Sequence, residues 1–179
     1  SVGIRVTDAD GGVTTTSVPI TVTNVDPGVN LLAPDFAMEG DRVSFACVGS
    51  DQGSDFLAID WDLDGDGTYE RPNTTQQIDT TFPNEGTYRV RCRVRDGAGG
   101  SASAEHEIRI ANVKPSVEVE FGGPFQEGSE AIIRVQATDA GADELSFRFD
   151  FDGDSIPDTE ASSSNLGRHT YKNEGEYLV

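Results

Sequence analysis

The sequence predicts an all-β protein made of tandem antiparallel β-sandwiches. Apolar residues alternate with polar ones at a period of two, as at Tyr88, Val90 and Cys92, and this period is typical of half-buried strands rather than of helices. The whole pattern recurs, since Trp61 and Phe149 lie 88 residues apart in similar acidic segments. A period of that length makes one module the unit of structure. Each module has space for about seven short strands, which is the number typical of a two-layer sandwich.

The predicted strands of the middle module follow the runs of alternating residues. They lie at residues 29–32, 42–48, 57–63, 76–82, 86–95 and 101–111, with a further short strand at 68–71. No segment carries the roughly 3.6-residue period of an amphipathic helix. The alternation is clearest in four strands, through Val43, Phe45 and Cys47, through Ile59, Trp61 and Leu63, through Tyr88, Val90, Cys92 and Val94, and through Ile108 and Ile110.

The repeat divides the chain into one complete module and two partial ones. Residues 1–25 are predicted to be the C-terminal hairpin of a first module, residues 26–114 a complete module, and residues 115–179 a third module that lacks its final strands. We therefore interpret the chain as an excerpt from a longer protein. Because an unpaired strand edge invites pairing with other strands, each partial module is expected to be completed by the next segment of that chain or by another copy.

Charge narrows the classes of partner. The formal net charge is −19, from 32 acidic and 13 basic residues, which disfavours nucleic acid and anionic membranes and attracts divalent cations. No stretch approaches the roughly 18 apolar residues of a membrane span, so no membrane insertion is expected. Adaptation to high salt would also give acidity with few lysines, and it stays open as an alternative explanation.

An acidic loop occurs twice at the repeat distance, at residues 61–70 and 149–158. Each copy places carboxylates at offsets 0, 2, 4 and 8, with a backbone carbonyl at offset 6, which matches the first nine positions of an EF-hand-like calcium loop. The predicted ligands are Asp62, Asp64, Asp66, Thr68 and Glu70 in the first copy, and Asp150, Asp152, Asp154, Ile156 and Asp158 in the second, where Thr68 and Ile156 contribute their carbonyls.

Calcium is the expected occupant of these loops. Oxygen ligands without nearby His or Cys disfavour zinc and copper, and magnesium requires a tighter octahedron. The twelfth-position glutamate of an EF-hand is missing, so we expect a dissociation constant of roughly 10⁻⁴ to 10⁻³ M, as in extracellular modules. The alternative is an acidic turn whose aspartates accept hydrogen bonds from backbone amides.

Two cysteines lie on different predicted strands. Cys47 and Cys92 are the only cysteines, and Trp61 lies between them in the sequence, as in the Cys, Trp, Cys order of immunoglobulin domains. A core disulfide is preferred, and two buried thiols remain the alternative, which a Cα separation above about 7 Å would favour. Trp61 shares a strand face with Ile59 and Leu63, so we expect it in the core rather than as a sugar-stacking platform.

One predicted strand carries a stripe of arginines on its outer face, formed by Arg89, Arg91, Arg93 and Arg95. The adjacent strands offer four acidic residues, Asp60, Asp62, Glu105 and Glu107. Cross-strand ion pairing is the simpler explanation. The functional alternative is an interaction stripe for an acidic glycan or a neighbouring copy.

Several motifs together resemble one known family. These are the aromatic, Asp and Gly-Asp-Gly run at 61–67, the F-P-N-E-G-T-Y-R-V run at 82–90, the V-R-D-G-A-G-G turn at 94–100, and the N-V-x-P junctions at Asn24 and Asn112. They resemble the polycystic kidney disease, or PKD, domain. The resemblance implies an immunoglobulin-like β-sandwich in secreted or cell-surface proteins, where such modules serve as spacers, adhesive units or accessory modules of hydrolases. The extra aspartates depart from the common family pattern and favour a metal.

Catalysis finds no support in the sequence. It contains no GxSxG or HExxH motif, and His106 and His169 stand apart from any cysteine or second histidine. We expect a non-enzymatic extracellular structural or adhesive array, rod-like because its proline-containing junctions are short, stiffened by calcium and self-associating or completed by neighbouring modules. The alternative is an accessory module of a secreted hydrolase that binds substrate, a surface glycan or a protein.

Overall fold

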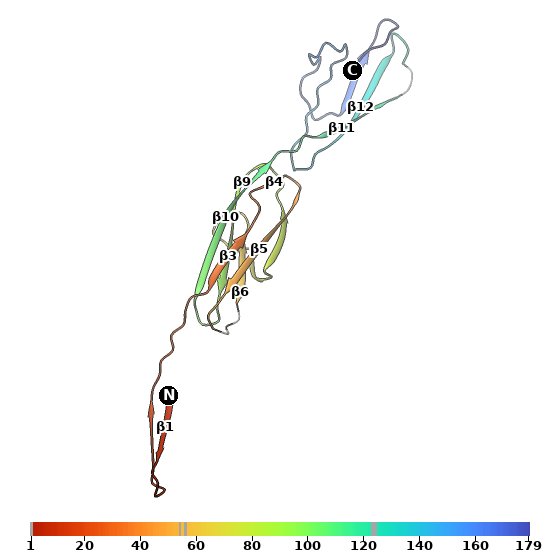
Figure 1. Cartoon of the computed structure of the whole chain (residues 1–179). Helices are drawn as coiled ribbons and strands as arrows, with labels where there is room; N and C mark the ends of the chain where they lie inside the picture. The colour runs from red at the N-terminus through yellow and green to blue at the C-terminus, as the bar shows by residue number, and fades with distance from the viewer. Residues whose placement is uncertain (1, 54, 56, 123–124) are drawn as a thin grey trace.

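The computed structural model describes residues 2–53, 55, 57–122 and 125–179. All of its assigned elements within those ranges are β-strands, which confirms the predicted all-β class. Figure 1 shows three bodies in a row, a hairpin, a sandwich and a more open sheet, along an elongated molecule. None of the described residues forms a helix of the length and apolarity that crossing a membrane requires.

The strands are β1 (Val2–Thr7), β2 (Val13–Val18), β3 (Gly28–Leu32), β4 (Phe36–Met38), β5 (Arg42–Ser50), β6 (Ala58–Asp62), β7 (Arg71–Thr74), β8 (Gln77–Thr81), β9 (Gly86–Arg95), β10 (Ser101–Ala111), β11 (Ser116–Phe121), β12 (Glu130–Thr138) and β13 (Leu166–Thr170). The predicted division of the chain at 25/26 and 114/115 remains a prediction. It falls in the gaps between β2 and β3 and between β10 and β11.

The middle body is a sandwich of two sheets. One sheet has the order β4-β10-β9-β6-β7 and the other β3-β5-β8. All pairings in it are antiparallel except that β4 runs parallel to the end of β10. The inward faces of the two sheets form one core, in which Phe45, Trp61, Val90 and Ile108 are among the largest fully buried side chains. The buried Trp61 confirms that it belongs to the core.

A disulfide joins the two sheets of this sandwich. Cys47 on β5 and Cys92 on β9 are bonded, with their Cα atoms 6.2 Å apart. Both are fully buried. The preferred prediction of a core disulfide is therefore confirmed. Closing a loop between residues 45 positions apart stabilises the folded state by about 4 kcal/mol in the chain-entropy model.

Two short strands differ from the prediction. The prediction of a strand at 68–71 is wrong. The backbone N–H of Thr68 donates to Asp66 Oδ1 at 2.6 Å, so it does not form a hydrogen bond to a neighbouring strand. The short strand of this region is β7, which begins at Arg71. The strand β4 was not predicted, because three residues are too few to show an alternation.

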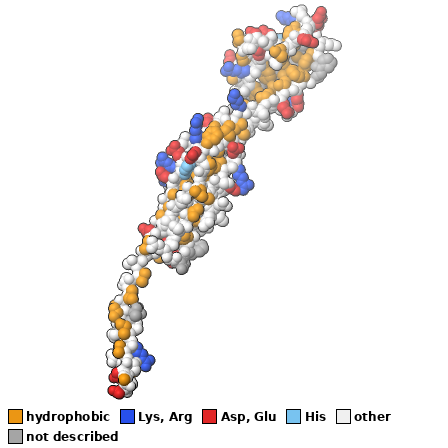
Figure 2. Space-filling view, in the orientation of Figure 1, with side chains coloured by type: hydrophobic (Ala, Val, Ile, Leu, Met, Phe, Trp, Pro, Cys, Tyr) orange, Lys and Arg blue, Asp and Glu red, His pale blue; other side chains and the backbone are white. Residues whose placement is uncertain are grey.

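The third body is a single sheet of order β11-β12-β13 with a long loop folded against one face. Its small core contains Ile133, Phe149 and Phe151. The apolar residues of β11 stay exposed, with Phe121 at 58% and Val117 at 59%, and Figure 2 shows the apolar surface on this body. The β1–β2 hairpin likewise exposes Ile4 and Val6. Completion of these bodies by further strands remains a prediction.

Candidate metal centre

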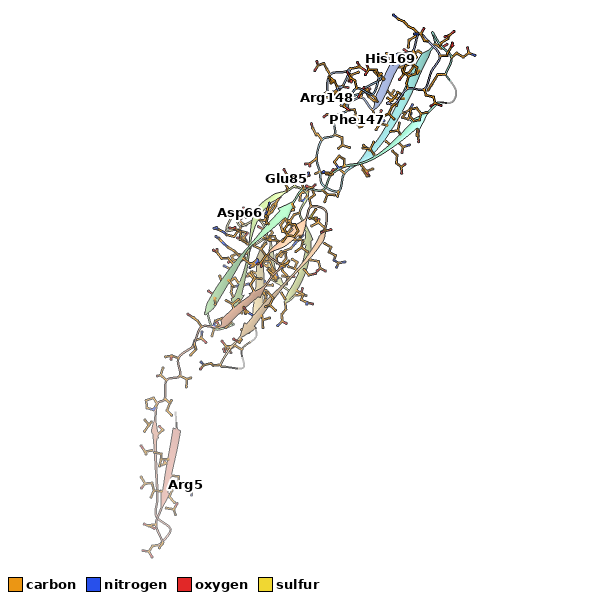
Figure 3. The ribbon with its side chains drawn as sticks, turned by 45° about the horizontal axis from the view of Figure 1, so that its top comes forward. Arg5, Asp66, Glu85, Phe147, Arg148 and His169 are labelled. Atoms are coloured by element: carbon orange, nitrogen blue, oxygen red, sulfur yellow. A yellow bond between two sulfur atoms is a disulfide. The ribbon has the colours of Figure 1, made fainter. Side chains whose placement is uncertain are left out.

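The first acidic loop follows β6 and brings its four predicted side-chain ligands together. Asp62, Asp64, Asp66 and Glu70 each offer a carboxylate oxygen, and all four oxygens lie within 4.8 Å of one another. Asp62 is buried at the end of β6, whereas the other three are exposed. Because β6 and β10 both pair antiparallel with β9, the loop lies toward the end of the sandwich where β10 leaves for the third module. Asp66 and Glu85 are both labelled toward that end in Figure 3.

Backbone hydrogen bonds and two glycines fold this loop. Gly65 and Gly67 have φ values of +74° and +92°, in the left-handed region that favours glycine. A Cβ at Gly65 would lie 2.7 Å from the carbonyl oxygen of Arg89. The carboxylates accept N–H groups from the loop, Asp62 from Gly65 at 2.7 Å and Gly67 at 3.0 Å, Asp64 from Asp66 at 3.1 Å, Asp66 from Thr68 at 2.6 Å, and Glu70 from Leu63 at 3.1 Å.

The second loop reproduces this hydrogen-bond pattern residue for residue. Asp150 accepts from Gly153 at 2.8 Å and Ser155 at 2.7 Å, Asp152 from Asp154 at 3.2 Å, Asp154 from Ile156 at 2.7 Å, and Asp158 from Phe151 at 2.7 Å. Three of the predicted ligands, Asp150, Asp152 and Asp158, come within 4.8 Å of one another. Asp154 does not join them, although its backbone hydrogen bond matches that of Asp66, and the hydrogen bonds give no physical reason for the difference.

The pKa of Asp150 reflects the same donors. Burial raises it, but the N–H groups of Gly153 and Ser155 outweigh burial and hold the pKa of Asp150 below its ordinary value. This carboxylate is therefore charged at neutral pH and able to bind a cation. The predicted carbonyl ligands, Thr68 and Ile156, both lie in exposed parts of their loops, and their role stays a prediction.

The donor set fits a hard divalent cation. Two carboxylate charges within 4.8 Å of each other repel by about 3 kcal/mol or more at an effective dielectric constant of 20. The loop N–H groups offset part of this repulsion, in agreement with the acidic-turn alternative. One oxygen each of Asp64, Asp66 and Glu70 takes part in the backbone hydrogen bonds of the described loop, which leaves a second oxygen for a ligand. Hard oxygen ligands such as these carboxylates are the kind that calcium binds.

The arginine stripe lies beside the first loop and is paired. Arg89 is 3.9 Å from Glu107 and Arg91 is 3.0 Å from Glu105. Arg93 and Arg95 both bind Asp60, at 2.8 and 2.7 Å. Cross-strand ion pairing thus accounts for all four guanidinium groups. Asp62, expected among the partners, instead accepts the N–H groups of Gly65 and Gly67. The interaction stripe remains a prediction.

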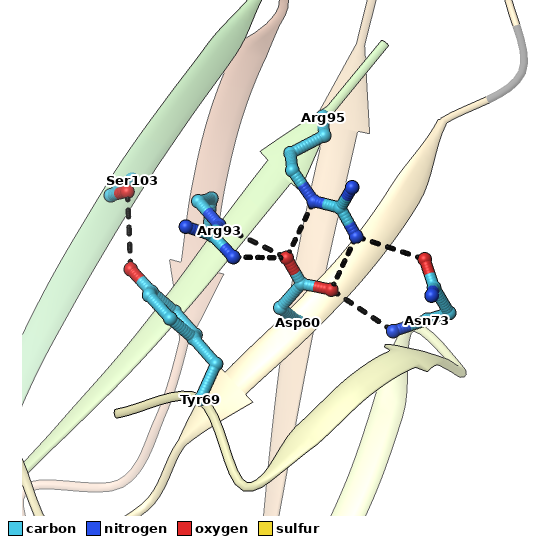
Figure 4. A network of polar contacts seen from close by, with 6 residues as sticks. All are labelled: Asp60, Tyr69, Asn73, Arg93, Arg95 and Ser103. Atoms are coloured by element: carbon cyan, nitrogen blue, oxygen red, sulfur yellow. Dashed lines mark hydrogen bonds and ion pairs between the residues drawn. The ribbon is translucent and has the colours of Figure 1, made fainter. Parts of the chain in front are cut away.

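A polar network links the stripe to the loop, as Figure 4 shows. Arg93 lies 4.0 Å from the centre of the Tyr69 ring, a cation–π contact. The Tyr69 hydroxyl lies 3.4 Å from Ser103 Oγ on β10. The loop is therefore attached at its C-terminal end to the β9–β10 pair. Sequence analysis missed this role of Tyr69, because an aromatic residue beside an arginine-bearing strand has no local signature.

Sequence analysis also missed a third group of carboxylates, formed by Glu39, Asp139 and Asp143. The signal that could have found it is an Asp-x-Gly-x-Asp motif that occurs at 51–55 and again at 139–143.

The chain is similar to one protein family and to several solved structures. A family model described as the PKD domain matches residues 24–111. Among solved structures, a PKD domain of an M14-like peptidase from Thermoplasmatales archaeon SCGC AB-540-F20 is 21% identical and has a TM-score of 0.43, covering 49% of this chain and 98% of its own. The PKD1 domain of the Vibrio cholerae metalloprotease PrtV is 22% identical, with a TM-score of 0.38 and coverage of 48% and 98%.

A third solved structure is described as belonging to carbohydrate-binding modules from the β-sandwich superfamily. It is 20% identical with a TM-score of 0.42, and the match covers 63% of this chain and 55% of that one. No curated protein matches the chain. The family-model match and the disulfide-linked sandwich over the same residues show that the middle module, at residues 24–111, belongs to the PKD domain family.

Proposed function

We propose that the chain is a non-enzymatic part of an extracellular, rod-like array of PKD modules that is stiffened by calcium and serves as a structural or adhesive spacer. The observation that carries this proposal is the acidic loop, in which four carboxylate oxygens lie within 4.8 Å of one another. Its hydrogen-bond pattern recurs one module later. A cation bound there would neutralise a repulsion that the loop N–H groups offset only in part.

An extracellular location is supported by the disulfide. Cys47 and Cys92 are bonded within the core, and disulfides persist in oxidising compartments. A loop without the twelfth-position glutamate binds calcium weakly, with a dissociation constant of roughly 10⁻⁴ to 10⁻³ M. Such a loop fills only where calcium is abundant, which again favours the outside of the cell.

Calcium would stiffen the rod by fixing its loops. The first loop connects β6 to β7 at the end of the sandwich that faces the next module, and Tyr69 ties it to β9 and β10. Calcium at ten times its dissociation constant adds about 1.4 kcal/mol per site to the free energy of unfolding. One filled loop would therefore make a measurable difference to the stability of its own small module.

Calcium titration calorimetry tests this proposal. Wild-type chain is expected to bind calcium, and Asp64→Ala and Asp152→Ala are each expected to remove the binding of one loop, because each deletes a carboxylate from its group. Glu118→Ala serves as the matched control, since it removes the same charge from an exposed position of β11. If wild type and both loop variants give identical heats, the loops do not bind calcium.

The accessory-module alternative has one observation in its favour. Phe36 on β4 is 54% exposed and lines a surface depression with Pro34, Ala37 and Met38. An exposed ring beside a depression is a surface on which a sugar can stack. Binding of soluble oligosaccharides that is lost in Phe36→Ala, while calcium binding is retained, would support this alternative over the spacer.

A further inference from the structure

The third carboxylate group lies at the junction between the middle and third modules. Glu39 follows β4 directly, and Asp139 follows β12. One oxygen each of Glu39, Asp139 and Asp143 lies within 4.8 Å of the other two. The modules touch here, since the backbone N–H of Ala142 donates to the carbonyl of Pro83 at 2.8 Å. The group therefore combines oxygen atoms from two modules.

Glu39 is buried, and half of its carboxylate lacks a partner. The residue is only 1% exposed. Its Oε1 accepts the N–H of Val113 at 2.7 Å, whereas its Oε2 is buried without a hydrogen-bond partner among the described residues. The ion pairs found in the described part of the chain also leave out Glu39, Asp139 and Asp143. A buried carboxylate oxygen without a partner is strongly unfavourable, and a bound cation would satisfy it.

Gly141 brings the third module onto this oxygen. A Cβ at Gly141 would lie 2.9 Å from Glu39 Oε2 and 2.7 Å from the carbonyl of Pro83, closer than real Cβ contacts permit. The N–H of Gly141 donates to Asp139 Oδ1 at 2.8 Å, which turns the loop and leaves the second oxygen of Asp139 free of that bond. Glycine at this position therefore lets the two aspartates meet Glu39.

The same loop occurs one module earlier. The Asp-x-Gly-x-Asp motifs at 51–55 and 139–143 are 88 residues apart. In the earlier copy the N–H of Gly53 donates to Asp51 Oδ1 at 2.6 Å, the same turn as at Asp139. Asp51 Oδ2 is again buried without a partner among the described residues. An unpartnered buried carboxylate oxygen therefore accompanies each copy of the motif, that of Asp51 in the first copy and that of Glu39 beside the second.

We propose that Glu39, Asp139 and Asp143 bind one calcium ion that clamps the middle module to the third. All three ligands are hard carboxylate oxygens, and neither His nor Cys belongs to the group, which favours calcium over zinc or copper. The clamp shares no residue with the acidic loops, so it stands or falls independently of the function proposed for them. It would couple the calcium level directly to the stiffness of the junction.

The test is calcium chloride titration of the full chain in a background that lacks both loop sites, Asp64→Asn with Asp152→Asn. This background is expected to retain one calcium. Adding Asp143→Asn, at an exposed position, should weaken that binding at least about tenfold, because the charge of the ligand set decides calcium affinity. Glu39→Gln should act in the same way. Glu127→Gln is the matched control, since Glu127 holds the repeat position equivalent to Glu39 but lies outside the group.

The outcomes separate the two calcium proposals. A background variant that binds no calcium overturns the clamp while leaving the loops intact as an explanation of wild-type binding. Equal calcium affinity in the background with and without Asp143→Asn also overturns it. A background variant that binds as much calcium as wild type instead overturns the loop sites and supports the clamp. Small-angle scattering adds a second readout. The clamp predicts that calcium narrows the distribution of molecular lengths in wild type. It also predicts that calcium has no such effect on Gly141→Ala.

Discussion

Asp60 holds together the side-chain ion pairs on the five-stranded sheet of the middle module. It is fully buried, and its two oxygens bind Arg93, Arg95 and the backbone N–H of Asn73 at 2.7 to 3.0 Å. The hydrogen bond from Arg95, together with those from Asn73 and Arg93, holds the pKa of Asp60 far below its ordinary value, against the opposing effect of burial. Removing this one charge would leave two half-buried guanidinium groups without their anion.

We predict that Asp60→Asn lowers the free energy of unfolding by about 3 kcal/mol near neutral pH, because one partner of a buried charge pair is lost. The folded-state pKa of Asp60 lies below its unfolded value, so the stabilisation is present above about pH 4 and is lost as the pH falls further. The difference between wild type and Asp60→Asn should therefore shrink in acid. Urea unfolding across a pH series measures it.

Asp79→Asn is the matched control for this prediction. Asp79 also binds an arginine, Arg42, but both side chains are exposed, and exposed ion pairs contribute about 0 to 1 kcal/mol. Equal effects of the two substitutions, or a difference for Asp60→Asn that does not change with pH, would show that burial of the pair is unimportant.

The sequence predicted the pairing of these residues but not their burial. Alternation along the arginine strand placed the charges on one face, and the acidic residues of the adjacent strands followed from the same period. The register of β6 against β9 decides which acidic residue pairs with two arginines, and it places Asp60 opposite Arg93. Register across residues 33 positions apart has no local signal in the sequence.

At the scale of strands, the alternating runs were predictable, whereas the three-residue β4 and the turn at 68–71 were not. The strands β5, β9 and β10 follow from their buried faces, because one face of each must meet the core. The three-residue β4 exists only because it pairs with the end of β10, a tertiary interaction. The loop at 68–71 turned away from a ladder because aspartates compete for backbone N–H groups.

The disulfide between the two sheets is expected to stabilise the middle module. Replacing both Cys47 and Cys92 with alanine should lower the free energy of unfolding by about 4 kcal/mol from the lost cross-link and by a further amount from the cavity. Replacing both with valine should recover part of the second loss, since Val135 and Ile4 hold the equivalent positions of the other modules. Denaturant unfolding of the two double variants compares them directly. Equal stability of the alanine and valine variants would mean that packing at this site is unimportant.

At the scale of the whole molecule, the repeat made the architecture and the acidic loops predictable, whereas the junction was not. Because the sequence pattern recurs every 88 residues, a loop recognised in one module predicts the same loop in the next. Both acidic loops could therefore be found together. The cluster of Glu39 with Asp139 and Asp143 joins residues about 100 positions apart across two modules. Only the packing of Gly141 against Glu39 brings them together, and such packing follows from the three-dimensional fold.

The open faces of the outer bodies lead to the last prediction, that the chain self-associates. The apolar residues of β11 are exposed, including Val119 at 49%, and a face of this kind is covered in a complete sandwich. Strands from another copy can cover it, most readily at physiological ionic strength, where salt screens the repulsion between acidic chains. Sedimentation should show association that rises with concentration and that Val119→Lys weakens by charging the face. Glu118→Lys, on the opposite face of the same strand, should leave association intact. A wild-type chain that stays monomeric at every concentration would mean that these faces do not recruit a second copy.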